Sequence, residues 1–102
     1  MKKIGKPNYN LEAIKLSFNA IEKLNMTYSS MQGQYELGFS DQDVVDAIQA
    51  LTCADFYKSM PPKHENYAAW HDVYKSTFEK VDLYLKFQID KRGEMIISFK
   101  ER

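Results

Sequence analysis

Tyrosine and lysine side chains recur at alternating positions in two segments near the C-terminus. VDLYLKFQID (81–90) contains Tyr84 and Lys86, and EMIISFK (94–100) contains Lys100. Two neighbouring ammonium groups repel each other, so their proximity suggests a site that meets a negative group such as phosphate. A tyrosine beside lysines could also hold a nucleobase or move a proton. The alternative is an ordinary solvated sheet face, on which lysine and tyrosine are common.

The two segments are predicted to form one β-hairpin, and its register decides whether these side chains meet. Apolar and polar residues alternate along 81–90, which is typical of a strand with one buried face. The loop KRG carries glycine in its last position, a common solution for a three-residue hairpin loop, and it pairs Asp90 with Glu94. A slip of one residue would destroy the agreement between the apolar faces. The register then gives these pairs: Leu85 with Phe99, Phe87 with Ile97, Ile89 with Met95, Tyr84 with Lys100, and Lys86 with Ser98.

A further lysine lies in DFYKSM (55–60), directly before two prolines. Phe56 and Tyr57 are good strand formers, so the segment is predicted to be a short strand. Lys58 then either extends from an edge strand into solvent or faces something negative. In a regular strand, Phe56 and Met60 lie on the same side as Lys58, where they would shield it or stack on a base.

Other kinds of catalytic site find less support. His64 and His71 have no cysteine or carboxylate at a metal-ligand spacing, so no metal site and no cofactor are expected. Cys53 has no adjacent histidine in sequence, so it is not expected to be a nucleophile. The glycines match no phosphate-binding loop.

The first half of the chain is predicted to be helical. NLEAIKLSFNAIEKLN (10–25) has one apolar stripe at spacings of three and four, which predicts an amphipathic helix. SDQDVVDAIQAL (40–51) predicts another, with Ser40 as its N-cap. The weaker segment between them predicts a short strand near Met26–Tyr28 and a short helical turn ending at Gly38.

The second half is predicted to consist of strands. Besides 55–60 and the hairpin, 67–78 is rich in β-branched and aromatic residues and favours a strand, although its aromatic spacing would also suit a helix. The segment 61–66 is predicted to be a loop, because two prolines cannot donate to a strand ladder. The predicted order is therefore helices first and strands after.

Length and composition limit the class of protein. The chain has 102 residues, which predicts one domain covering 1–102. No run of about 18 apolar residues is present, so no membrane span is expected. The single cysteine fits a reducing compartment, and the cytoplasm is the expected location. The net charge of zero argues mildly against a nucleic-acid binder, although basic ends around an acidic middle permit a basic face.

Four blocks, in order and with matching spacing, resemble one known family. The blocks are DFYKSM (55–60), WHDVY (70–74), YLK (84–86) and ISFKE (97–101). They are similar to the MqsR family, the motility quorum-sensing regulator toxins of type II toxin–antitoxin systems. The N-terminal half agrees loosely, mainly in its length and in ELGF (36–39). The resemblance implies a RelE-like α+β fold, with two or three N-terminal helices on one face of a twisted antiparallel sheet.

The resemblance also implies an activity: mRNA endoribonuclease without ribosome or metal, which inhibits translation and growth until a cognate MqsA-type antitoxin neutralises it. Operator DNA would be bound through the antitoxin and not directly by this chain. The 2′-hydroxyl of the RNA would attack the adjacent phosphate and leave a 2′,3′-cyclic phosphate. Two alternatives stay open, a ribosome-dependent RelE-like nuclease and a non-catalytic module that binds RNA or protein.

Four positions match the residues that the family associates with activity, Lys58, His71, Tyr84 and Lys100. The two lysines would stabilise the anionic phosphorane. His71 and Tyr84 would transfer protons or orient the 2′-hydroxyl. The family pattern has glutamine in place of His71, so this histidine either strengthens acid–base catalysis or replaces a positioning hydrogen bond. The side chains expected to contact RNA are Tyr57, Met60, Lys75 and Lys86.

Overall fold

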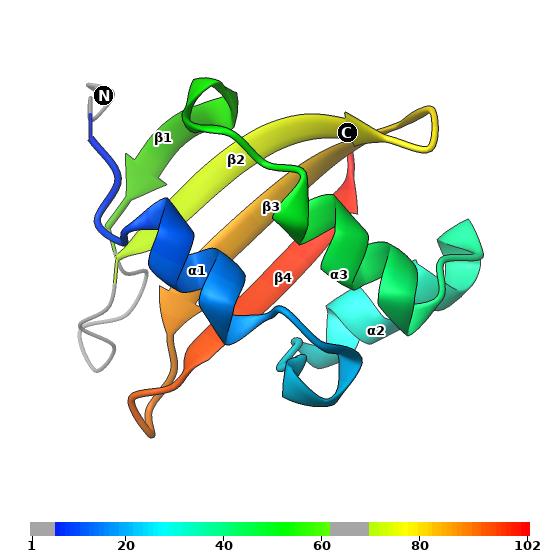
Figure 1. The fold of residues 1–102 in the computed structure, drawn as a ribbon, viewed down its shortest axis with the longest axis horizontal. Helices are drawn as coiled ribbons and strands as arrows, with labels where there is room; N and C mark the ends of the chain where they lie inside the picture. The colour runs from blue at the N-terminus through cyan, green and yellow to red at the C-terminus, as the bar shows by residue number, and fades with distance from the viewer. Residues whose placement is uncertain (1–5, 62–69) are drawn as a thin grey trace.

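Three α-helices and a four-stranded sheet make up the computed structural model, which describes residues 6–61 and 70–102 (Figure 1). The elements are α1 Leu11–Ser17, α2 Tyr28–Leu37, α3 Asp41–Gln49, β1 Phe56–Met60, β2 His71–Phe78, β3 Val81–Ile89 and β4 Met95–Glu101, with 3₁₀ turns at Ile21–Lys23 and Cys53–Asp55. Helices come first and strands after, as predicted. The first residues of the predicted strand 67–78 and most of the predicted loop 61–66 lie outside the described residues.

The strands form one antiparallel sheet in the order β1-β2-β3-β4, so each strand pairs with its neighbour in sequence. The predicted register of the β3–β4 hairpin is confirmed, including the pair Tyr84 and Lys100. At the turn, Gly93 has a φ of +81°, and the Asp90 N–H donates to the Glu94 carbonyl over 2.7 Å. Loop length and alternation were sufficient to predict this pairing because both act within one short segment.

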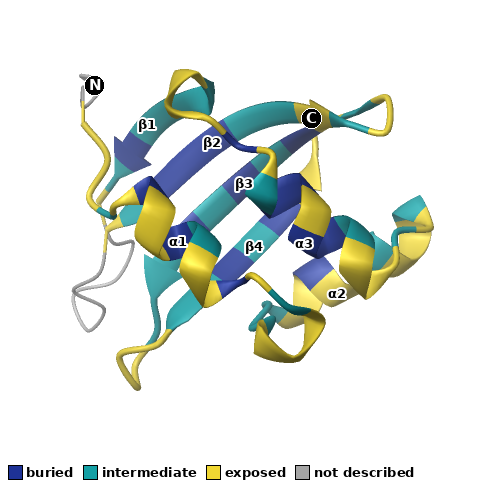
Figure 2. Cartoon of the chain, in the orientation of Figure 1, coloured by how far each residue is buried: buried dark blue, intermediate teal, exposed yellow. Residues whose placement is uncertain are grey.

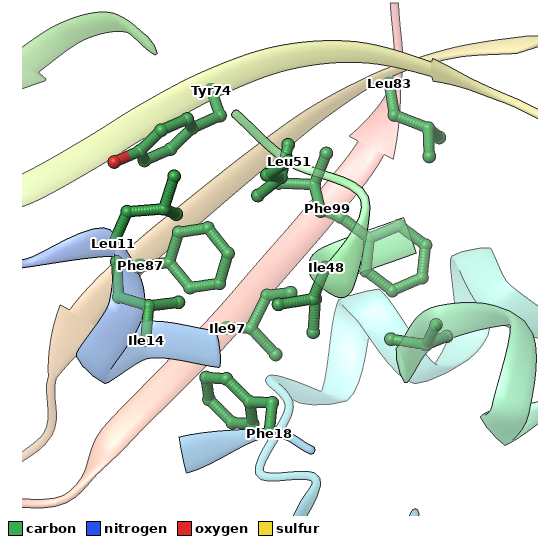
Figure 3. Close-up of a cluster of buried hydrophobic side chains, with 12 residues drawn as sticks. Leu11, Ile14, Phe18, Ile48, Leu51, Tyr74, Leu83, Phe87, Ile97 and Phe99 are labelled. Atoms are coloured by element: carbon green, nitrogen blue, oxygen red, sulfur yellow. The ribbon is translucent and has the colours of Figure 1, made fainter. Parts of the chain in front are cut away.

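α1 and α3 cover one face of the sheet, and the hydrophobic core lies between them and the strands (Figures 1 and 3). Along β3, Leu83, Leu85 and Phe87 are buried, whereas the residues between them are more exposed. Phe18, just after α1, packs against Phe87 with ring centroids 6.1 Å apart. Figure 2 shows the buried strand positions beneath the two helices. The arrangement is α+β and agrees with a RelE-like fold, as predicted.

The predicted helix 40–51 is confirmed as α3. The Asp43 N–H donates to Ser40 Oγ over 3.0 Å, and the Ser40 N–H donates to the Asp43 carboxylate over 2.9 Å. This reciprocal capping box satisfies two donors at the start of the helix. Val44 and Ile48 are buried against the sheet, on the face that the spacing predicts.

The predicted helix 10–25 is wrong beyond Ser17, where α1 ends. The amide of Gln49, in α3, donates to the Lys15 carbonyl over 2.8 Å and to the Phe18 carbonyl over 3.2 Å. Carbonyls at a helix end need partners from outside the helix, and here α3 supplies them. The break therefore depends on a tertiary contact, which spacing within one segment does not reveal.

The outer edge of β4 is covered by α2 and the residues before it. The Ile97 N–H donates to the Asn25 carbonyl over 2.9 Å. The Phe99 N–H donates to Ser30 Oγ, inside the first turn of α2, over 2.8 Å. α2 is therefore anchored along the edge strand, and it does not join α1 and α3 on the core face.

The structure corrects two predictions for the segment between the first and last helices. The predicted strand at Met26–Tyr28 is reduced to a single parallel bridge at Met26. The predicted short helical turn is the ten-residue α2, which is capped at the predicted position by Gly38 with a φ of +74°. Thr27 accounts for the early start, since its side chain accepts from the Ser30 N–H and caps the helix.

Candidate active site

An open groove of about 1050 Å³ lies on the sheet face away from α1 and α3. Side chains alternate across a strand, so Tyr84 and Lys86 face away from the core residues Leu85 and Phe87. The floor of the groove contains Lys58, Val73, Tyr84, Lys86, Ser98 and Lys100. Its wall is formed by α2 and contains Tyr28, Gln32, Gly33 and Glu36. All four strands and one helix thus contribute to one surface.

The sheet register gathers a row of polar side chains across three strands. Tyr84, on β3, pairs with Lys100 of β4 on one side and with Lys75 of β2 on the other. Directly opposed side chains on one face have Cβ atoms about 4.5–5.5 Å apart. Lys86 lies two residues further along β3 and also lines the groove. One phenol therefore lies between two ammonium-bearing side chains.

β1 is irregular at its start, and this irregularity positions Lys58. Phe56 pairs with Tyr74, but Lys58 pairs with Val73, so β1 has an extra residue between the two pairs. Phe56 lies on the core side, with its ring edge-on to Tyr74 at 5.6 Å, and both Tyr57 and Lys58 line the groove. The prediction that Phe56 lies beside Lys58 is wrong, because the bulge reverses the alternation between them.

Tyr57 and Tyr84 form a cluster with two lysines. Their rings stack with centroids 6.2 Å apart and planes 26° apart. Lys75 Nζ lies 3.9 Å from the centroid of Tyr57 and 5.9 Å from that of Tyr84. Lys58 Nζ lies 5.2 Å from the Tyr57 centroid. Each cation–π contact at an exposed site contributes about 0.5–1 kcal/mol, so the rings and the ammonium groups hold one another in place.

His71 lies on the same strand as Lys75 but away from Tyr84. His71 pairs with Met60 of β1. Met60 lines the groove together with Lys58, so the prediction that these two side chains lie on the same side is confirmed. His71 is four residues from Lys75, the register partner of Tyr84, or about 13 Å along the strand. The fold thus brings together Tyr57, Lys58, Lys75, Tyr84, Lys86 and Lys100 and leaves His71 beside Met60 at one end.

Lysine side chains supply positive charge at the groove. Within residues 6–61 and 70–102, no three His, Cys, Asp or Glu side chains are grouped to hold a metal ion. His64 lies outside the described residues, and Cys53 is exposed. Lysine ammonium groups around an open groove can bind a phosphodiester and stabilise negative charge that develops on it.

Comparison with known proteins identifies the family. The family model described as "Motility quorum-sensing regulator, toxin of MqsA" matches residues 6–101. The chain belongs to the MqsR toxin family. It is also similar to the mRNA interferase toxin MqsR of Escherichia coli (strain K12), with 31% identity over 96 residues, or 94% of this chain and 95% of that relative. Among the described residues, no helix of this MqsR-family chain has the length and apolar character needed to cross a membrane.

A buried carboxylate that was not predicted from the sequence holds together the two strands next to the groove. Asp72 is fully buried and accepts from Ser59 Oγ over 2.8 Å, the Tyr9 N–H over 2.8 Å and the Asn8 side chain over 3.1 Å. Ser59 and Asp72 are register partners, so this bond fixes β1 on β2 next to Lys58. The sequence did contain a hint of this contact, because Ser59 and Asp72 are polar residues at core-facing positions of two predicted strands.

The pKa values of two tyrosines near this carboxylate are shifted. Burial, and to a lesser degree the charge of Asp72, raise the pKa of Tyr74 to about 12. Burial also raises the pKa of Tyr9, whose hydroxyl donates to the Trp70 carbonyl over 2.7 Å. Both phenols are therefore neutral at physiological pH, and both pack in or against the hydrophobic core.

A second missed residue is Arg102, whose guanidinium carbon lies 5.8 Å from the Tyr84 ring centroid. Its Nη2 atom lies 3.4 Å from Asp82 Oδ1 and donates to the Ser76 carbonyl over 3.3 Å. Arg102 lies two residues after Lys100, so alternation along the strand could have placed both side chains on the same face of the sheet. It adds a further cation beside the Tyr84 phenol.

Proposed function

We propose that this chain is the toxin of a type II toxin–antitoxin system and acts as an mRNA interferase that needs neither ribosome nor metal. The observation that carries the proposal is the groove floor, which Lys58 lines together with the register partners Tyr84 and Lys100. The E. coli relative is named an mRNA interferase toxin, which supports the reaction class. Cleavage of messages would inhibit translation and growth.

The proposed reaction is attack by the RNA on its own backbone. The 2′-oxygen bonds to the adjacent phosphorus, and its proton passes to a base. The bond from phosphorus to the 5′-oxygen then breaks, and that oxygen takes up a proton. The products are a 2′,3′-cyclic phosphate and a 5′-hydroxyl end. No metal is required where ammonium groups stabilise the crowded anionic phosphorane.

The positions of the four candidate residues suggest separate roles. Lys58 and Lys100 lie on the floor and stabilise the phosphorane, each contact contributing about 3–4 kcal/mol when preorganised. Tyr84 lies between lysines and orients or deprotonates the 2′-hydroxyl. His71 lies about 13 Å along β2 from the partner of Tyr84, so it positions the RNA from one end of the floor.

Four further side chains are proposed to hold the RNA strand. Lys75 and Lys86 lie on the same face as Tyr84 and attract phosphates. Tyr57 and Met60 line the β1 side of the groove and offer apolar surface to an unstacked base. The chain has a net charge of zero, so we expect RNA to be bound through this small basic surface and not through an overall positive charge.

The proposal includes a partner and a location. The family description, toxin of MqsA, supports a cognate MqsA-type antitoxin that neutralises the activity. Operator DNA is then reached only through the antitoxin. The chain acts as one toxin domain, 1–102, in the cytoplasm, where its substrate is made.

Incubation of pure protein with naked RNA in EDTA tests this function. The proposal predicts discrete cuts that end in 2′,3′-cyclic phosphate and 5′-hydroxyl groups. Cleavage only when ribosomes are added would support a ribosome-dependent RelE-like nuclease. No cleavage under either condition would leave a non-catalytic binding module as the better account.

A further inference from the structure

α2 forms one wall of the groove and presents a distinct set of side chains to it. Tyr28, Gln32 and Glu36 line the groove and lie one helical turn apart, so they form a continuous stripe along the helix. Gly33 lies beside this stripe and also lines the groove. None of these residues belongs to the proposed catalytic floor, and none was predicted from the sequence to be a site residue.

The groove is divided by charge. Three ammonium groups lie on the floor, from Lys58, Lys86 and Lys100. α2, with the sequence YSSMQGQYEL, carries no lysine or arginine, and Glu36 is its only charged residue. Phosphates are attracted to the lysines of the floor and repelled by Glu36 and by Glu101, the acidic residue of β4 that also lines the groove. An RNA strand bound with its backbone on the lysines can therefore direct bases towards α2, the wall without basic residues.

The stripe has the chemistry that recognises an unpaired base. Tyr28 is 74% exposed, and its hydroxyl accepts a hydrogen bond from the Gln32 amide over 2.9 Å, which holds the ring along the helix. An exposed tyrosine ring is a stacking surface for a base. The Glu36 carboxylate accepts hydrogen bonds from base amino groups, and the Gln32 amide can donate and accept.

Gly33 keeps this wall open. A Cβ built at Gly33 meets no heavy atom within 4 Å, so nothing in the described protein requires glycine there for space. Glycine inside a helix is also unfavourable compared with alanine. A residue without a side chain at this position leaves room in the groove next to Tyr28 and Gln32.

We propose that the α2 wall is a base-binding subsite of the RNA groove. Tyr28 stacks on an unpaired base next to the cut phosphate, and Gln32 and Glu36 bond to the base edges. The inference rests on the proposed function and deepens it, because it assigns the reading of RNA sequence to α2 and the cleavage to the sheet.

The test compares two tyrosines of the same helix. Tyr28 lines the groove, whereas Tyr35 is 86% exposed and is not part of its lining. We expect Tyr28→Ala to lower kcat/KM on a cleaved RNA by about 10-fold, the usual loss for one base stack, and Tyr28→Phe to retain most of it. Tyr35→Ala is the matched control and should cleave like the wild type.

RNA substrates that lack one base make the test specific. Abasic sites are introduced one at a time around the cut, and each substrate is cleaved by wild type and by Tyr28→Ala. At one position, removal of the base should slow the wild type and leave Tyr28→Ala with little further loss. Glu36→Gln should change the preferred base at that same position rather than the rate on every RNA.

Three outcomes would overturn the subsite. One is that Tyr28→Ala and Tyr35→Ala cleave equally well. Another is that Tyr28→Ala loses the same factor on every abasic RNA, which indicates a structural defect. The third is unchanged cleavage by Tyr28→Ala with weakened antitoxin binding, which would make α2 a protein-docking surface. If the wild type itself cuts no RNA, the proposed function fails instead, so the two failures are distinguishable.

Discussion

Tyr57 and Tyr84 stack on each other with ring centroids 6.2 Å apart, although they come from strands that are not neighbours in the sheet. The contact passes over β2, and Lys75 of that strand lies near both rings. Tyr57 follows the core-facing Phe56 and so faces the groove, and the bulge between Phe56 and Lys58 lets Lys58 face it as well. The stack therefore connects the strand that carries Lys58 to the strand that carries Tyr84.

Lys75→Ala should weaken RNA binding about equally for all sequences. An ammonium group that contacts a phosphate releases a counterion, so its loss lowers the slope of log affinity against log salt by about 0.7 for a single strand. The measurement is the affinity for a non-cleavable 2′-O-methyl oligonucleotide over a range of salt concentrations. Lys15→Ala, on α1 across the core, is the control. A slope unchanged by Lys75→Ala would show that this lysine only supports the tyrosine rings.

His71→Gln should retain cleavage within about fivefold of the wild type, because the imidazole lies away from Tyr84 and glutamine preserves a positioning hydrogen bond. A general acid or base contributes about 100-fold to 10 000-fold, so the two roles predict clearly different rates. The measurement is single-turnover cleavage between pH 5 and 8. Proton transfer by His71 would instead be indicated by a large loss together with a changed pH profile.

Asp72→Asn should reduce the free energy of unfolding by about 1–3 kcal/mol, because the amide cannot accept all the hydrogen bonds that the buried carboxylate accepts. The measurement is urea denaturation at neutral pH. Asp46→Asn, at an exposed position of α3, is the control and should change stability by less than about 0.5 kcal/mol. Equal effects of the two substitutions would mean that the buried network contributes no stability.

Stability should fall as the pH rises from about 10 to 12, and Tyr74 should account for part of that fall. Its pKa is raised from 10.0 to about 12, mainly by burial. Above pH 10 the unfolded chain loses this proton while the folded chain keeps it, so the unfolded state is favoured. The stability of Tyr74→Phe should therefore decline less between pH 9 and 11 in chemical denaturation. A parallel decline in both proteins would contradict the raised pKa.

The sequence predicted the features of the fold that depend on local chemistry. The hairpin register followed from the KRG loop and from alternation, so the neighbours Tyr84 and Lys100 were identified correctly. Ser40, the N-cap of α3, and Gly38, the C-cap of α2, were also predicted correctly, because a cap acts within a few residues of its helix.

Features that depend on tertiary contacts were not predictable in the same way. The end of α1 depends on Gln49, which comes from another helix. The bulge that separates Phe56 from Lys58 depends on how β1 pairs with β2. Alternation of side chains along a strand does not reveal where an extra residue is inserted. α2 became a wall of the groove because Ser30 anchors it to β4, a contact between distant parts of the chain.

The rate at which Lys58→Ala and Lys100→Ala cleave naked RNA in EDTA tests the central claim most directly. Each lysine is proposed to stabilise the phosphorane, so each variant should lose at least tenfold, and about 100-fold to 1000-fold if the contact is fully preorganised. Lys15→Ala should cleave like the wild type, and all three variants should unfold at similar temperatures. Wild-type rates for both Lys58→Ala and Lys100→Ala, with cyclic-phosphate ends still formed, would contradict the assignment of cleavage to this face of the sheet.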